Sequence, residues 1–134
     1  MNLTEVWAAV FAVTTALVVA FQLALASGAP WGTYAMGGAF PGRMPAPMRA
    51  AAVVQSAVLI GLGIVVLSGA GLVASDLVDA WPWLIWVPVA VSGVAVVLNA
   101  STRSRGERRI WLPVALILLA CSLGVALGPN PAPG

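Results

Sequence analysis

Long apolar segments alternate with short polar segments along this chain. Apolar residues continue almost without a break over residues 4–27, 47–73, 80–100 and 109–127. Each segment is close to, or above, the roughly 20 residues that an α-helix needs to cross the hydrocarbon core of a bilayer. The pattern therefore predicts an all-α membrane protein, in which four transmembrane helices form a bundle within a single domain, residues 1–134.

The segments outside the apolar runs are short. The longest is the loop of residues 28–46, between the first two predicted helices, and a tail rich in Pro and Gly occupies residues 128–134. The first run could be a cleaved signal peptide, since a small-residue pattern lies near its end. However, it is longer than the apolar core of a signal peptide, and its start carries Glu5 rather than a basic residue. We therefore expect a retained helix and no soluble domain.

The composition favours a lipid environment. Hydrophobic residues make up 61% of the chain and charged residues 7%, whereas charged residues are about a quarter of a typical soluble domain. The chain therefore has too few polar side chains to cover a globule in water. Its net charge of +2 is too small to suggest a nucleic-acid partner. We expect the lipid bilayer as a partner, and no nucleic acid.

The basic residues predict how the chain sits in the membrane. All six are Arg, and they occupy only the first and third connections between the predicted helices. Short loops rich in Arg and Lys mark the cytoplasmic face, and with four helices these two connections lie on the same side. We therefore predict that both termini are periplasmic. The six residues are Arg43, Arg49, Arg103, Arg105, Arg108 and Arg109.

Proline residues predict helix starts and one bend. Pro47, Pro82 and Pro113 fall in the first turn of predicted helices, where the missing N–H has no helical partner in any case. Pro88 lies well inside the third predicted helix. A proline there removes one backbone hydrogen bond, so the third helix should be kinked.

Few residues could support catalysis. The chain has no His, and no carboxylate or Lys lies in the interior of a predicted helix, so a general base within the bilayer is missing. The single Cys121 excludes an intramolecular disulfide and a cysteine-based metal cage. Small four-helix multidrug exporters carry an acid in their first helix, but Glu5 lies at the helix start, where it complements the helix dipole. We expect no enzymatic activity, no cofactor and no metal.

Three amide side chains form the main polar feature within the predicted helices. Gln22 lies near the end of the first helix, Gln55 near the start of the second, and Asn99 in the last turn of the third. All three are therefore near the predicted cytoplasmic end. An amide in hydrocarbon is unfavourable unless it is hydrogen-bonded, so we expect them to bond one another. Such a cluster either fixes helix packing, at about 0.6–2 kcal/mol per bond, or forms the polar floor of a pocket.

The segment of residues 28–49 combines turn residues with large apolar side chains and two Arg. We expect it to be ordered and packed against the cytoplasmic helix ends, because its rings and Met side chains would otherwise stay in water. Trp31, Tyr34, Arg43 and Arg49 are the candidate residues for binding a ligand or partner, since aromatic faces and guanidinium groups are suited to recognition. Alternatively, the Arg side chains contact lipid phosphates and the rings form an interfacial belt.

The same segment resembles part of a family of small bacterial four-helix inner-membrane proteins. The matching residues are GAPWG at 28–32, the Gly pair at 37–38, the Pro-Gly pair at 41–42 and Pro-x-x-x-Arg at 45–49. The family has Leu where Met44 and Met48 stand in this chain. The resemblance implies a multi-pass protein of the bacterial inner membrane, and it implies no activity and no functional residue.

Two functions fit these features. The first is a non-enzymatic membrane protein, an accessory subunit or small homo-oligomer, whose 28–49 loop contacts a protein partner or lipid. The second is a transport or binding protein for an apolar or anionic small molecule, held in a pocket between the cytoplasmic helix ends and the loop. A protein that copurifies in stoichiometric amount would favour the first, and a retained small molecule would favour the second.

Overall fold

The computed structural model describes residues 1–129, and these residues are helical over most of their length. Four of the described segments are long and apolar enough to cross a membrane, which confirms the predicted all-α class and the four spans. The spans are α1 (Leu3–Ala26), α2 (Ala46–Gly69), the segment Pro82–Ser101, and α5 (Arg105–Ala126). The predicted tail lies outside the described residues from residue 130 onward.

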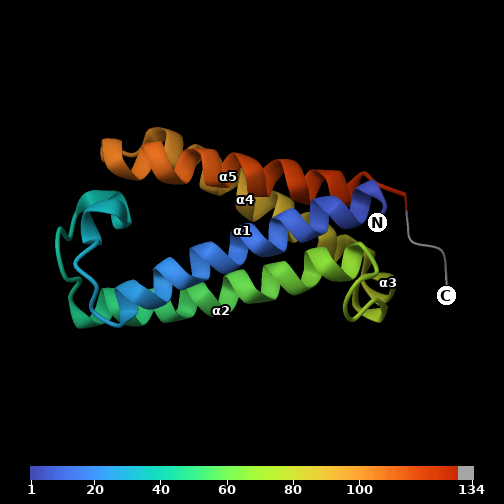
Figure 1. The fold of residues 1–134 in the computed structure, drawn as a ribbon, viewed down its shortest axis with the longest axis horizontal. Helices are drawn as coiled ribbons and strands as arrows, with labels where there is room; N and C mark the ends of the chain where they lie inside the picture. The colour runs from blue at the N-terminus through green and yellow to red at the C-terminus, as the bar shows by residue number, and fades with distance from the viewer. Residues whose placement is uncertain (130–134) are drawn as a thin grey trace.

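The spans form two helical hairpins. Helix α1 packs along α2, and α4 (Trp86–Ser101) packs along α5, while α1 and α5 join the two hairpins. Figure 1 shows the loop between α1 and α2 (residues 27–45, hereafter the loop) at one end of the bundle, and the N-terminus with the short helix α3 (Asp76–Ala80) at the other. Helix α1 lies near α5 at the α3 end and diverges from it toward the loop end (Figure 1). The hairpins are therefore splayed toward the loop.

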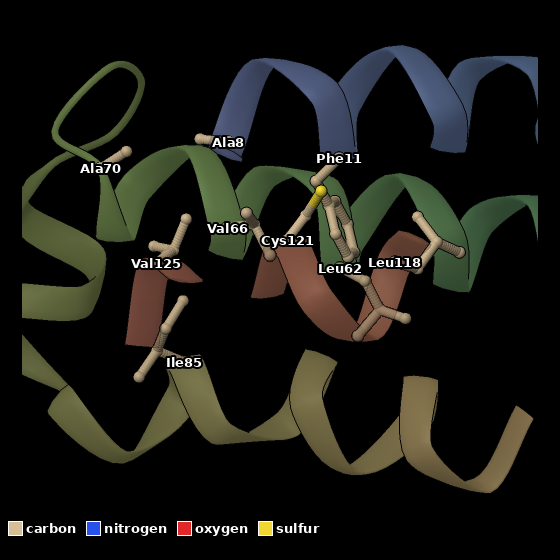
Figure 2. Close-up of a cluster of buried hydrophobic side chains, with 9 residues drawn as sticks. All are labelled: Ala8, Phe11, Leu62, Val66, Ala70, Ile85, Leu118, Cys121 and Val125. Carbon is tan, nitrogen blue, oxygen red and sulfur yellow. The ribbon is translucent and has the colours of Figure 1, made fainter. Parts of the chain in front are cut away.

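The tightly packed part of the bundle lies in the half near α3. A cluster of buried side chains from all four spans fills the space between the helices there (Figure 2). Small residues let the backbones approach: a Cβ added at Gly124 would lie 2.6 Å from the Trp7 ring, and one at Gly69 would lie 2.8 Å from Ile85 Cδ1. The cluster consists of Ala8, Phe11, Leu62, Val66, Ala70, Ile85, Leu118, Cys121 and Val125.

Helix α5 starts four residues before the predicted position 109, because Ser104 caps it. The Ser104 side chain accepts a hydrogen bond from the Glu107 backbone N–H (3.2 Å), which satisfies one free donor of the first turn. Pro113 consequently lies inside α5 rather than in its first turn, so that prediction was wrong. The error followed from taking the charged residues 103–109 as a solvated connection.

The turn between the second and third spans is also longer than the hydropathy suggested. Helix α2 ends at Gly69 rather than near residue 73, and Gly71 takes a positive φ of 75°. The Ser68 hydroxyl donates to the Ala74 carbonyl (2.8 Å) and accepts from the Val78 N–H (3.2 Å). The third span then begins as a 3₁₀ helix, η3 (Pro82–Ile85), and continues as α4, with Pro88 in the first turn of α4.

Candidate functional site

A cavity of about 720 Å³ lies between the two hairpins in the half of the bundle near the loop. Side chains from all four spans line it, and most of them are apolar. Leu62 and Leu118 belong both to the buried core cluster and to the cavity lining, so the core forms the floor of the cavity. The cavity exists because the hairpins diverge above this floor.

The cavity is open on the side between α2 and α4. Its lining includes Val54 and Leu98, which are 63% and 64% exposed, one on each of these helices. Helices α2 and α4 contact each other much less than either contacts its hairpin partner. Apart from Gln55 and Ser101, the exposed side chains of α2 and α4 that line the cavity are aliphatic, which suits an opening toward the acyl chains of a bilayer.

The three predicted amides all line this cavity, from three different helices. The expected hydrogen bonds between them are not found in the described residues. Instead, Asn99 Nδ2 donates to the Ala95 carbonyl of its own helix (2.7 Å), and Gln22 Oε1 is buried with no hydrogen-bond partner. Gln55 is exposed. Asn99 lies on the other hairpin, beyond the splay, and Gln22 and Gln55 do not bond each other within their own hairpin, so all three amides offer polar groups to the cavity.

The loop closes one end of the cavity and is held by contacts with α1 and α5. Phe21 stacks on Trp31 (centroids 5.8 Å apart, planes at 13°) and meets Trp111 edge-on (4.6 Å, 61°). Trp111 Nε1 donates to the Tyr34 carbonyl (2.7 Å), and Ser104 Oγ donates to the Thr33 carbonyl (3.1 Å). These contacts agree with the expectation of an ordered loop packed against the helix ends. Residues 34–37 of the loop contribute to the cavity lining.

The four candidate residues of the loop do not form one site. Of them, only Tyr34 lines the cavity, and its ring covers Gly106, where an added Cβ would lie 2.6 Å from Tyr34 Cε1. Arg49 Nε donates to the Ala26 carbonyl (2.8 Å), which caps the C-terminal end of α1. The Arg43 guanidinium lies against Gly28. Both Arg side chains therefore lie at the end of α1, outside the cavity lining.

Sequence reasoning missed Glu107 and Thr102, which both line the cavity. Thr102 Oγ1 donates to Glu107 Oε2 (2.9 Å), and the Ser104 N–H donates to Thr102 Oγ1 (3.3 Å). The signal that could have found Glu107 is the Ser-x-x-Glu spacing of Ser104 and Glu107, which is typical of a helix start. That spacing places the carboxylate in the first turn of α5, beside the cavity, rather than in a solvated loop.

The described residues hold no group of three or more His, Cys, Asp or Glu side chains that could bind a metal ion. We therefore assign no metal or cofactor role to any of them. Comparisons with protein-family models, with curated proteins and with solved structures find no match to this chain. The functional argument consequently rests on the geometry of the cavity.

Proposed function

We propose that this multi-pass membrane protein binds a largely apolar small molecule in the cavity between its two hairpins. The observation that carries the proposal is the cavity itself, because about 720 Å³ falls within the roughly 300–1,000 Å³ of small-molecule sites. Its lining has the usual composition of such sites, in which many apolar side chains surround a few polar groups. The amides of Gln22, Gln55 and Asn99 and the Thr102 hydroxyl supply the polar groups.

The amides are suited to orienting a ligand. Gln22 offers a buried group without a partner within the described residues, and a side-chain amide presents either an acceptor or a donor. A ligand group that bonds it gains more than the same group gains at the surface, because an unpaired buried polar atom costs about 1–3 kcal/mol. The apolar part of the ligand then enters through the opening between α2 and α4.

The alternative function, an accessory subunit or homo-oligomer that uses the loop for partner contact, has less support. The groups that made the loop attractive for recognition are engaged within the chain. Trp31 stacks on Phe21, and Arg49 binds the end of α1. A partner would therefore have to displace contacts that already hold the loop in place. For a binding role we propose no enzymatic step.

Substituting Ala95 with Phe tests the proposed function. Ala95 lies on α4 and lines the cavity, so a phenyl ring there occupies the ligand volume. We expect native mass spectrometry of gently solubilised wild-type protein to show a retained small molecule, and Ala95→Phe to lose it. The matched control is Ala90→Phe, one to two turns earlier on the exposed face of α4, which should retain the ligand. Equal occupancy in the two variants would contradict the proposed site.

We further propose a bacterial inner-membrane location, with both termini periplasmic and a bend in the third span. All six Arg residues support this orientation, because they lie in the first and third connections or in the opening turns of α2 and α5 beside them. The bend is proposed at the change from η3 to α4, because Pro88, in the first turn of α4, has no N–H to donate.

Cysteine labelling tests this orientation. Ser75 and Arg103 are both exposed and lie in different connections. In a Cys121→Ala background, an impermeant thiol reagent added to intact cells should label Ser75→Cys and leave Arg103→Cys unlabelled until the cells are opened. Labelling of Arg103→Cys from outside would reverse the proposed topology.

A further inference from the structure

Glu107 is the only charged side chain among the described residues that line the cavity. None of the six Arg residues lines it. Among the described residues the carboxylate accepts one side-chain hydrogen bond, from Thr102 Oγ1, and none from an Arg. Arg108, one residue further along α5, instead donates Nη1 to the Thr102 carbonyl (3.1 Å). The charge on the described cavity lining is therefore negative and lies at the end where the loop closes the cavity.

The helix start at Glu107 differs from the one at Glu5. At α1 the capping box is complete: the Asn2 N–H donates to Glu5 Oε2 (3.0 Å), and the Glu5 N–H donates to Asn2 Oδ1 (2.8 Å). At α5 only the second half exists, since the Ser104 N–H goes to Thr102 Oγ1 rather than to the Glu107 carboxylate. Among the described residues, each carboxylate accepts one hydrogen bond and retains capacity for another donor. Only Glu107 lines the cavity, whereas Glu5 caps a helix start at the other end of the bundle.

Aromatic side chains lie in the same part of the cavity. Phe21, Tyr34 and Trp111 all line it, and the Trp111 indole contacts both other residues, through its ring to Phe21 and through Nε1 to the Tyr34 carbonyl. Aromatic faces attract cations, and the attraction increases when water is excluded. A carboxylate beside aromatic rings recognises an ammonium or phosphonium group and repels an anionic one. This charge argues against the anionic ligand that the Arg residues suggested.

We infer that the cavity is selective for a lipophilic cation, whose charged group lies near Glu107 and whose apolar part extends toward Leu62 and Leu118. This inference rests on the proposed function, since it specifies the ligand of the same cavity. The direction follows from the lining: the charged and hydroxyl groups, Glu107 and Thr102, lie at the loop end, and the core side chains lie at the floor. The opening between α2 and α4 would admit such a ligand from the bilayer.

Isothermal titration calorimetry on the whole chain in a zwitterionic detergent tests the inference by measuring the affinity for two probes. Tetraphenylphosphonium is the cationic probe, and triphenylphosphine oxide is a neutral probe of similar chemistry; empty micelles give the background for each. We expect Glu107→Gln to weaken tetraphenylphosphonium binding by about tenfold and to leave the neutral probe unchanged. Glutamine keeps the acceptor for Thr102, and the melting temperature checks that the variant is folded. Glu5→Gln, at the other end of the bundle, should change neither affinity.

The outcomes distinguish failure of the cation selectivity from failure of the proposed ligand-binding function. The inference would be overturned, with the cavity retained as a binding site, if the wild-type protein binds the neutral probe as tightly as the cation. The same conclusion would follow if Glu107→Gln leaves cation binding unchanged. An equal loss of both probes in Glu107→Gln would assign Glu107 a structural role and would also overturn it. If the wild-type protein binds neither probe above the micelle background, both the inference and the proposed function fail.

Discussion

Replacing Gly32 with Ala should release the loop and open the end of the cavity. Gly32 is buried, and its N–H donates to the Gly42 carbonyl (2.9 Å). A Cβ at this position would lie 1.8 Å from the Phe40 carbonyl oxygen and 2.7 Å from that of Gly42. No rotamer change relieves a clash with backbone atoms, so the two sides of the loop must separate. The contacts of Trp31 and Tyr34 with α1 and α5 would then be lost with them.

Limited proteolysis measures this release. We expect the loop of the wild-type protein to resist trypsin at Arg43, and the Gly32→Ala variant to be cleaved there at least about tenfold faster. A clash of this kind costs more than about 1.4 kcal/mol, which is a factor of ten in the population of the open loop. The control is Gly93→Ala on α4, where an added Cβ meets nothing within 4 Å. Rapid cleavage of the wild-type protein would show that the loop is a loose linker and does not close the cavity.

The four spans could be predicted from the sequence because each depends on a local property, the length of an apolar run. The predicted starts of the first two spans, residues 4 and 47, lie within one residue of the observed starts of α1 and α2. The start of α5 was missed because its first turn, Arg105 to Arg108, is charged. Hydropathy does not distinguish a charged helical turn from a charged loop, whereas the Ser104 cap does.

The site was predicted only in part, and the reason is the geometry between the helices. The depth of Gln22, Gln55 and Asn99 follows from their positions in the spans, and these three residues line one cavity. Whether they bond one another depends on side-chain packing within the first hairpin and on how far the two hairpins diverge, and the sequence gives neither. The divergence of the hairpins is set by core side chains from both of them, such as Phe11 on α1 and Cys121 on α5, in the other half of the bundle.

The loop illustrates the same limit. Its aromatic content indicated that it would be packed, but not against which residues: the Tyr34 carbonyl accepts its hydrogen bond from Trp111, which lies 77 residues away along the chain. Arg43 and Arg49 were chosen as recognition residues because they are charged, and local composition does not reveal that the C-terminal end of α1 already uses Arg49.

Truncating Phe11 should have the largest effect on stability, because Phe11 joins the two hairpins at the floor of the cavity. The side chain is 2% exposed and lies in the core with Leu62, Leu118 and Cys121 (Figure 2). Lipid tails are as apolar as the core, so the loss comes from missing van der Waals contacts and the residual void rather than from transfer to water. We expect Phe11→Ala to lower the free energy of unfolding by roughly 3 kcal/mol.

A matched pair on α2 separates packing from hydrophobicity in this prediction. Val66 is fully buried in the core, whereas Val58 lines the open part of the cavity and is 52% exposed. Thermal unfolding in one detergent, followed by tryptophan fluorescence, should show a clear loss of stability for Val66→Ala and a change within about 0.5 kcal/mol for Val58→Ala. Phe11→Ala should be the least stable of the three variants. Equal losses at Val58 and Val66 would mean that the loop half of the bundle is packed as tightly as the α3 half. The hairpins would then not diverge above Leu62 and Leu118, and the bundle would have no space for a ligand.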